Sequence, residues 1–291
     1  MNYINPFLTY LNTIGYHYRT IKSKETHLKH NKDWLTTENK DILKVTTKTI
    51  QKYYQELQTE KSYCSISSIN NYLISIKQFY SWNCESGYLK THPFGKFKPH
   101  KEPKKNTRKP IALKTIKKLY KTSKYPIEKL LLILAYGCGL RTFELQHLKV
   151  RDIHLEKALL TVVSGKFNKQ RSIPLQAEHI NYLKNYIIHK NLKTEDYVFQ
   201  ALNGKISQAV LRSVFRKMQH RIGLPLGHFT IHHLRHSIAS HLVTRGVSIQ
   251  LVQYFLGHST LTTTEKYVHL NKTIHYEISK TMGNTTPKEN L

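Results

Sequence analysis

The sequence predicts a mainly α-helical protein with one small antiparallel β-sheet, arranged as two domains. Three observations predict this fold. Amphipathic helical periodicity dominates residues 1–95, a basic stretch with two prolines interrupts it at residues 96–109, and helical periodicity then resumes around a short β-rich segment. A chain of 291 residues is also long enough for two domains that each bury a core.

Four helices are expected in residues 1–95. The clearest begins after Ser65 and is stopped by Gly87. Its apolar face carries Ile66, Ile69, Leu73, Ile76 and Tyr80. A second helix, Thr47–Leu57, starts at a threonine cap. The segment Lys22–Leu35 and the first turns after Pro6 complete a four-helix domain.

Residues 96–109 form the expected linker. They contain seven basic residues, one acid at Glu102, and the prolines Pro99 and Pro103. Proline removes a helix donor and like charges repel, so this segment should be extended. Such a basic segment suits the phosphate backbone of a duplex held between two domains; the alternative is an exposed tether that makes no contact.

In residues 110–291 the hydrophobic period changes from helix to strand and back. Helices are expected at Leu113–Lys121 and Ile127–Tyr136, the second ended by glycines. Three β-rich runs follow at Ile153–Leu155, Leu159–Val163 and Arg171–Leu175, and residues 164–169 form the expected hairpin turn between the last two. Further helices are expected at Ala177–Ile188, Gln208–Ile222, His233–Thr244, Ile249–Phe255 and Lys272–Met282.

The charge balance indicates a polyanionic partner. The chain has 46 Lys and Arg against 18 Asp and Glu, a formal charge of +28. The excess occurs in both domains, since residues 1–109 alone carry 19 basic and 8 acidic residues. A basic surface that serves only solubility normally mixes both signs and has a far smaller net charge. We therefore expect both domains to bind nucleic acid.

Cysteine usage and hydropathy predict a cytoplasmic protein, and the expected binding to nucleic acid makes it nucleoid-associated. Cys64, Cys84 and Cys138 are widely spaced and form no CxxC pair, so neither a disulfide framework nor a thiolate zinc site is implied. Nothing near Met1 resembles a signal peptide, and no apolar run approaches the ~20 residues of a membrane span.

A set of phosphate-directed side chains indicates the chemistry. The candidate catalytic residues are Arg141, Lys166, His232, Arg235, His258 and Tyr267. Arginine matches phosphate oxygens bidentately, lysine and histidine transfer protons, and tyrosine can be a covalent nucleophile. This inventory suits attack of a tyrosine on a phosphodiester, a reaction that needs no metal.

Each of these residues also has an ordinary interpretation when taken alone. Arg141 opens a helix, where backbone amides favour an anion, but it could instead be a surface residue paired with Glu144 at i,i+3. Most lysines in turns, such as Lys166, are solvated, and Tyr267 is one of 19 tyrosines.

A zinc site is the alternative for His232 and His236, which are spaced i,i+4. The glutamate of an HExxH motif is absent, however, because His233 takes its place, and no third carboxylate ligand follows at suitable spacing. No metal is expected.

In order and spacing, these segments resemble the tyrosine recombinase (phage integrase) superfamily, nearest to its short Xer-type members. Residues 139–145, GLRTFEL, are similar to the family's GLR-x-x-EL, and residues 165–175, GKFNKQRSIPL, to its GKGNK…PL hairpin. Residues 232–236, HHLRH, match H-x-LRH, and residues 256–267 match LGHS…T-x-x-Y.

The resemblance covers roughly residues 111–283, and residues 65–94 are similar to the end of the family's core-binding domain. Two departures are visible. Phe167 stands where glycine is usual, and Ile231 where proline often precedes the first histidine. Neither removes a functional group, although Phe167 is expected to affect the mobility of the Lys166 hairpin.

The resemblance implies the fold and a role for each site residue. Residues 1–95 would be a four-helix core-binding, SAM-like domain, and residues 110–291 a mixed α+β catalytic domain. Tyr267 would attack a DNA phosphate to form a 3′-phosphotyrosyl bond. The other implied roles are phosphate binding by Arg141 and Arg235, protonation of the 5′ oxygen by Lys166, handling of the tyrosine proton by His232, a phosphate hydrogen bond from His258, and support of the arginines by Glu144.

The implied function is site-specific DNA recombination through a Holliday junction, without ATP, metal or other cofactor; the sequence has no GxxxxGK[ST] phosphate loop. The implied partner is double-stranded DNA with paired inverted binding elements. A homotetramer would hold two such sites and exchange the helix at residues 272–282 between neighbours. Two alternatives are type IB topoisomerase-like relaxation and DNA binding without catalysis. The motif details and the C-terminal helix favour the recombinase, and the intact set of six catalytic-type residues disfavours a non-catalytic protein.

Overall fold

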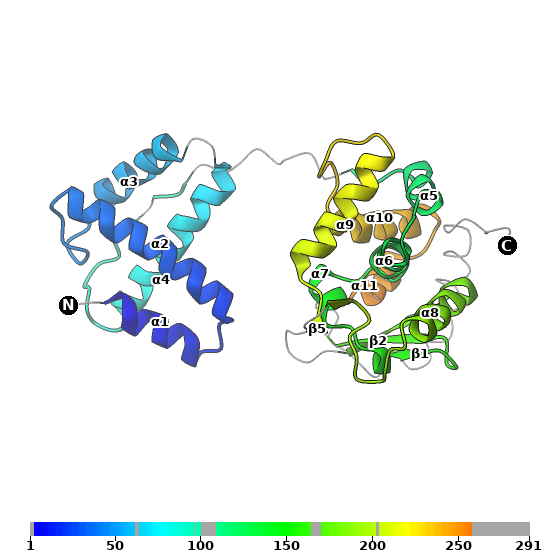
Figure 1. Ribbon diagram of the computed structural model, residues 1–291. Coiled ribbons are helices and arrows are strands. Elements are labelled where there is room, and N and C mark those ends of the chain that lie inside the picture. The colour runs from blue at the N-terminus through cyan, green and yellow to red at the C-terminus, as the bar shows by residue number, and fades with distance from the viewer. Residues whose placement is uncertain are drawn as a thin grey trace. The chain divides into compact units, whose positions relative to one another are not determined.

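The computed structural model describes residues 3–61, 64–95, 97–99, 109–163, 170–201 and 204–257. The chain divides into two compact units, residues 1–107 and 108–291. The described part is mostly helical, and its strands form two small antiparallel sheets in the second unit (Figure 1). The predicted fold class, mainly α with a small antiparallel sheet, is confirmed. Most of the predicted linker and the predicted helix at residues 272–282 lie outside the described residues.

The first unit contains the four predicted helices: α1 (Ile4–Thr13), α2 (Tyr18–Thr37), α3 (Thr47–Glu60) and α4 (Ile66–Glu85). Threonine and serine caps fix two of the helix starts. Thr46 accepts a hydrogen bond from the backbone N–H of Thr49, and Ser65 accepts one from Ser68. The apolar faces of the helices meet in one core, where the rings of Phe7 and Phe79 pack edge to face.

The second unit has more elements than the sequence predicted. Its helices are α5 (Leu113–Lys121), α6 (Pro126–Leu132), α7 (Thr142–His147), α8 (Ala177–His189), α9 (Gln208–Arg221), α10 (Ile231–Thr244) and α11 (Ile249–Leu256). Its strands are β1 (Ile153–His154), β2 (Leu159–Val163), β3 (Gln170–Pro174), β4 (Gln200–Ala201) and β5 (Gly204–Lys205). A π-helical turn, η1 (Ile133–Gly137), and a 3-10 turn, η2 (Val150–Asp152), complete it.

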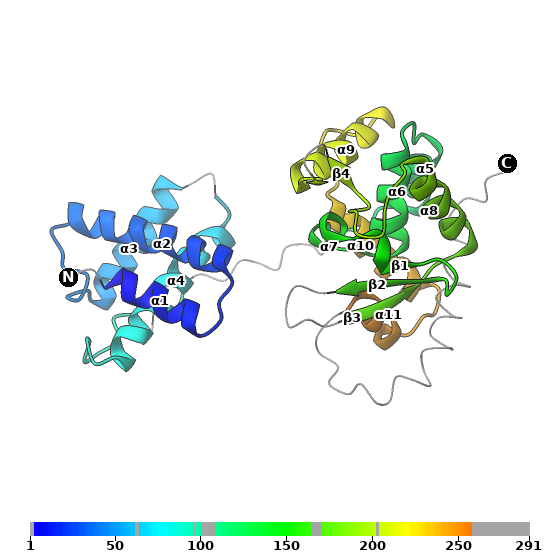
Figure 2. The ribbon, with the colours of Figure 1, turned by 60° about the horizontal axis from the view of Figure 1, so that its bottom comes forward.

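Strands β1, β2 and β3 form an antiparallel sheet in that order. Leu159 pairs with Pro174 and Val163 with Gln170, so the two strands of the predicted hairpin are confirmed. The turn between them, residues 164–169, lies outside the described residues. Helix α11 packs against β3 (Figure 2), which brings the end of α11 beside the base of this hairpin.

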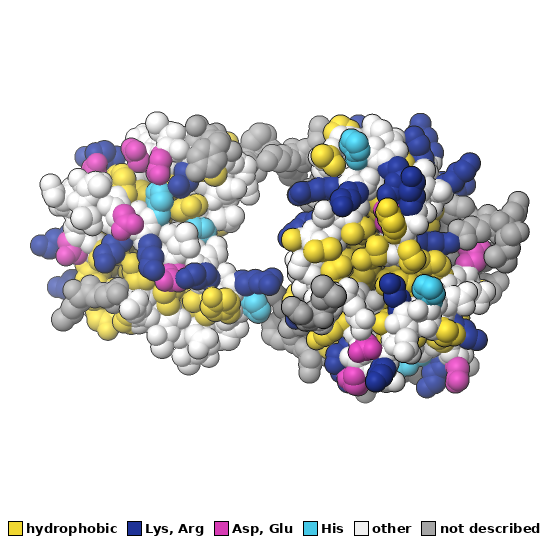
Figure 3. Space-filling view, viewed as in Figure 1, with side chains coloured by type: hydrophobic (Ala, Val, Ile, Leu, Met, Phe, Trp, Pro, Cys, Tyr) yellow, Lys and Arg dark blue, Asp and Glu magenta, His cyan; other side chains and the backbone are white. Residues whose placement is uncertain are grey.

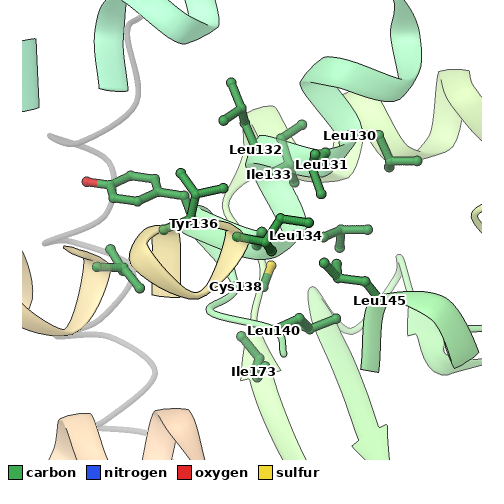
Figure 4. Packing of buried hydrophobic residues seen from close by; sticks show 14 of the residues in the cluster. Leu130, Leu131, Leu132, Ile133, Leu134, Tyr136, Cys138, Leu140, Leu145 and Ile173 are labelled. Carbon is green, nitrogen blue, oxygen red and sulfur yellow. The ribbon is translucent and has the colours of Figure 1, made fainter. Parts of the chain in front are cut away.

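The core of the second unit forms around the end of α6 and around η1, where residues 130–136 are buried and apolar on all sides. Residues 130–136 and Cys138 are buried, and their side chains pack against Leu140, Leu145 and Ile173 (Figure 4). The sequence predicted one helix through Tyr136, but the α-helix ends at Leu132 and a π turn follows. Gly137 permits a close approach there, because a Cβ at this position would lie 2.6 Å from Cε1 of the buried His179.

Lys and Arg side chains lie over the visible faces of both units (Figure 3), as the charge balance leads one to expect. Within the described residues, no helix is both long and apolar enough to cross a membrane.

A buried ion pair ties α9 to the start of α6. The Glu128 carboxylate accepts hydrogen bonds from Arg221 at 2.7 and 2.8 Å and from the backbone N–H of Lys124 at 2.9 Å. The Glu128 side chain is only 3% exposed. Its carboxylate therefore depends on these donors in place of water.

Arg221→Ala is expected to lower the free energy of unfolding by about 3 kcal/mol, because it leaves the Glu128 carboxylate buried without a cation. Urea titration of the whole chain measures this loss. The matched control is Arg151→Ala, which breaks an exposed pair with Glu195 and should cost less than about 1 kcal/mol. An equal decrease in the free energy of unfolding in the two variants would show that the Glu128–Arg221 pair does not stabilise the fold more than an exposed ion pair does.

Candidate active site

Three segments of the second unit converge at the motif that contains Arg141. Gly139 has a φ of +63°, which favours glycine, and a Cβ there would lie 2.8 Å from the Leu256 side chain at the end of α11. The turn therefore runs directly against α11. Arg141 follows as the N-cap residue of α7, and the buried Arg235 reaches the same place from the second turn of α10.

The Glu144 carboxylate is the centre of this cluster. Oε1 of Glu144 accepts from Nη1 of Arg141 at 2.8 Å, and Oε2 accepts from the Arg141 backbone N–H, also at 2.8 Å. Arg171, on β3, donates to the same two oxygens at 2.9 and 2.7 Å. One carboxylate thus holds two guanidinium groups from different elements in fixed orientations.

Arg235 links two backbone segments that are distant in sequence. Its Nη1 donates to the carbonyl of Gly139, and its Nη2 donates to the carbonyl of Leu256 at 2.5 Å. The same Nη1 lies 4.0 Å from Oε2 of Glu144. Arg141 adds a second connection to α11 through a 3.3 Å hydrogen bond to the Gly257 carbonyl. Hydrogen bonds donated by arginine side chains therefore hold the start of α7 beside the end of α11.

The cluster carries an excess of positive charge. Burial favours the neutral acid of Glu144, but hydrogen bonds from Arg171 and Arg141 outweigh it and lower the pKa to about 2. Burial, together with the charges of Arg141 and Arg171, lowers the pKa of Arg235 to about 9, so it remains charged at neutral pH. Three guanidinium groups around one carboxylate leave a net charge of +2.

Exposure separates the three arginines. The Arg141 side chain is 34% exposed, whereas those of Arg235 and Arg171 are 9% and 6% exposed. Arg141 is therefore the guanidinium most accessible to a solvent-borne anion, and the two buried arginines add to the positive potential behind it.

The structure brings together three of the residues that the sequence singled out: Arg141, Glu144 and Arg235. His232 lies one turn before Arg235 on α10, with its side chain exposed. The other three, Lys166, His258 and Tyr267, lie outside the described residues. Among the described residues, no group of three or more His, Cys, Asp or Glu side chains could hold a metal ion.

Comparison with known families identifies the chain. Residues 110–273 match the phage integrase family, and residues 4–87 match the phage integrase N-terminal SAM-like domain. The chain belongs to the phage integrase family. The resemblance that the motifs predicted is therefore confirmed.

Relatives of this phage integrase family member include named recombinases. It is 32% identical over 224 residues to a tyrosine recombinase of Pseudothermotoga lettingae, covering 76% of this chain and 77% of that protein. It is 30% identical over 272 residues to tyrosine recombinase XerA of Pyrococcus horikoshii, covering 91% and 87%. A solved lambda integrase tetramer bound to a Holliday junction shares the fold, with a TM-score of 0.68 and 18% identity over 91% of this chain and 79% of that one. The chain is an enzyme of the tyrosine recombinase type.

Sequence reasoning gave Arg171 no role in the site of this integrase. It placed the residue in a β-rich run and otherwise counted it only as a basic neighbour of Lys166. A signal was present. Positions 171 and 173 lie on one face of a strand, and Ile173 is a typical core residue. An arginine on the buried face of a strand requires a buried anionic or carbonyl partner. Glu144, already selected from its own motif, is that partner.

Glu144→Gln is expected to lower the free energy of unfolding of the second unit at pH 7 and to make that free energy less dependent on pH. The pKa of Glu144 is about 2 in the folded protein and about 4.3 in an unfolded chain. Its contribution is therefore complete above about pH 5 and is lost as the pH falls from about 4 towards 2. Wild type should exceed the variant by roughly 3 kcal/mol at pH 7, and the gap should close towards pH 2. Urea titrations across this range measure the gap; a gap independent of pH would contradict the assignment.

Proposed function

We propose that this enzyme is a site-specific DNA recombinase that cuts and rejoins strands through a 3′-phosphotyrosyl intermediate at Tyr267. The observation that carries the proposal is the arginine cluster, in which the partly exposed Arg141 guanidinium is oriented by Glu144 and flanked by buried positive charge. Such a fork matches the non-bridging oxygens of a phosphodiester.

In the proposed cleavage step, the Tyr267 hydroxyl oxygen bonds to phosphorus and the bond from phosphorus to the 5′ oxygen breaks. Arg141 and Arg235 stabilise the negative charge that develops on the non-bridging oxygens, and His258 adds a hydrogen bond there. Lys166 gives its proton to the departing 5′ oxygen. A free tyrosine has a pKa of about 10, so the nucleophile needs a proton acceptor, the role we assign to His232.

Rejoining uses the energy retained in the phosphotyrosyl ester. A 5′ hydroxyl from a second duplex attacks the phosphorus, releases Tyr267 and exchanges the strands without ATP. One round of exchange between two duplexes leaves a Holliday junction, and a second round resolves it. We assign this work to a homotetramer on two sites with inverted binding elements, joined by exchange of the helix at residues 272–282. A fold shared with a lambda integrase tetramer bound to a Holliday junction supports this assembly.

Tyr267→Phe is expected to abolish covalent adduct formation while leaving DNA affinity nearly unchanged, because only the nucleophilic oxygen is lost. Trapping on a nicked suicide substrate measures the adduct, and a gel-shift titration measures affinity. Tyr276→Phe is the matched control and should form adduct at the wild-type rate. Adduct in the Tyr267 variant, or its loss only in the Tyr276 variant, would contradict the assignment. Recombinant products rather than only relaxed circles distinguish the recombinase from a topoisomerase.

Lys166→Ala is expected to cut ordinary DNA about 10²- to 10⁴-fold more slowly, the range typical of general acid–base catalysis. It should recover substantially when the bridging 5′ oxygen is replaced by sulfur, because a thiolate leaves without a proton donor. His232→Ala should show no comparable recovery, since it acts on the nucleophile. If Lys166→Ala is equally slow on both substrates, Lys166 is not the acid, and Lys169 becomes the residue to test.

A further inference from the structure

Arg171, on β3, contacts both α7 and the end of α11, yet the proposed chemistry gives it no role. It lies on β3, its guanidinium grips Glu144 on α7, and its side chain packs against the backbone at the end of α11. It is also the most buried of the three arginines, with a side chain only 6% exposed. Bound DNA would therefore meet Arg141 first.

The grip on Glu144 depends on the shape of arginine. Nη1 and Nη2 of Arg171 donate to the two different carboxylate oxygens, at 2.9 and 2.7 Å. A planar fork of this kind fixes both the distance and the angle between β3 and α7. Lysine in the same place would keep the charge but offer a single point contact.

The contact with α11 is equally close. Gly257 caps α11 with a φ of +67°, and a Cβ there would lie 2.8 Å from Cδ of Arg171 and 3.1 Å from its Nη1. The peptide at Gly257 therefore rests on the Arg171 side chain. The next residue along the chain is His258, one of the predicted site residues.

Arg171 also stands at the base of the hairpin. It pairs with Val162, and Gln170 pairs with Val163, so a single residue separates Arg171 from residues 164–169, which contain Lys166 and lie outside the described residues. Strand β3 is thus fixed by Arg171, its first inward-facing residue. Nε of Arg171 is buried without an acceptor among the described residues, and buried polar groups without a partner are uncommon.

We propose that Arg171 is a positioning residue for strand cleavage, which locks the base of the Lys166 hairpin onto Glu144 and the Gly257 backbone. It acts through Lys166 and does not itself touch the reacting phosphate. Because Arg141 and Arg171 donate to the same carboxylate, these hydrogen bonds fix the position of β3 relative to Arg141. The inference rests on the proposed role of Lys166 as the proton donor.

Arg171→Lys tests this inference by keeping the charge and removing the fork. We expect single-turnover cleavage of a nicked substrate to fall about 100-fold, the effect of misplacing a reacting group by about 1 Å. DNA affinity should stay within about twofold, because Arg171 is buried and makes no phosphate contact. On DNA with sulfur at the bridging 5′ position, the variant should recover most of this 100-fold loss relative to wild type, because the misplaced acid no longer limits the rate. Loss of a merely structural residue would slow both substrates equally.

Two further variants make the outcome decisive. Glu144→Gln weakens the same lock from the other side and should show the same recovery factor on the sulfur substrate, which keeps the test available if Arg171→Lys fails to fold. Arg151→Lys, at an exposed arginine just before β1, should behave as wild type on both substrates. If Lys166→Ala recovers but neither Arg171→Lys nor Glu144→Gln does, the inference is wrong and the proposed function stands. If wild type forms no adduct, or Lys166→Ala does not recover, the proposed chemistry itself fails.

Discussion

One buried carboxylate organises the arginine cluster of the second unit. Glu144, with a side chain 3% exposed, accepts hydrogen bonds from two guanidinium groups and lies 4.0 Å from a third. Three arginines gathered without it would repel each other in a region that water scarcely enters, as the lowered pKa of Arg235 already shows. The carboxylate neutralises one of the three charges and leaves the other two unbalanced. A cluster of this kind is stable enough to fold and still attracts an anion.

The buried arginines and the exposed one have different physical tasks. Arg235 donates to two backbone carbonyls and Arg171 to both oxygens of Glu144, so their positions are determined by the protein alone. Arg141 shares Glu144 but keeps part of its side chain in solvent. A protein side chain whose contacts are fixed before binding loses little conformational entropy when its ligand binds. This favours tight and correctly oriented phosphate binding.

Much of this architecture could be predicted because local signals and tertiary packing agree. Thr46 and Ser65 are residue types that favour helix caps, and they cap α3 and α4. The β-rich runs expected at residues 159–163 and 171–175 pair with each other as β2 and β3. The π turn at Ile133–Gly137 could not be predicted, since a segment apolar on every side has no periodicity that distinguishes α from π winding. The β4–β5 pair is two residues per strand, too short to produce a pattern.

The site was predicted less completely than the fold, for a related reason. Motif spacing selected Arg141, Glu144 and Arg235 because each stands within a distinctive run of residues. Arg171 belongs to the same cluster through tertiary contact alone, 27 residues from Glu144 along the chain. A strand arginine becomes informative only when its inward register is known, and that register depends on pairing with β2.

The hydrogen bonds of Arg235 also determine when during synthesis the cluster can form. Its two carbonyl partners belong to Gly139 and Leu256, so the contact joins segments more than a hundred residues apart in the chain. A ribosome releases the N-terminal parts of a protein first, so the two hydrogen bonds of Arg235 cannot both form until the end of α11 has emerged. A nascent chain would therefore carry most of its positive charge well before this arginine cluster was complete. The arginine cluster is thus one of the last parts of the described structure to be completed during synthesis.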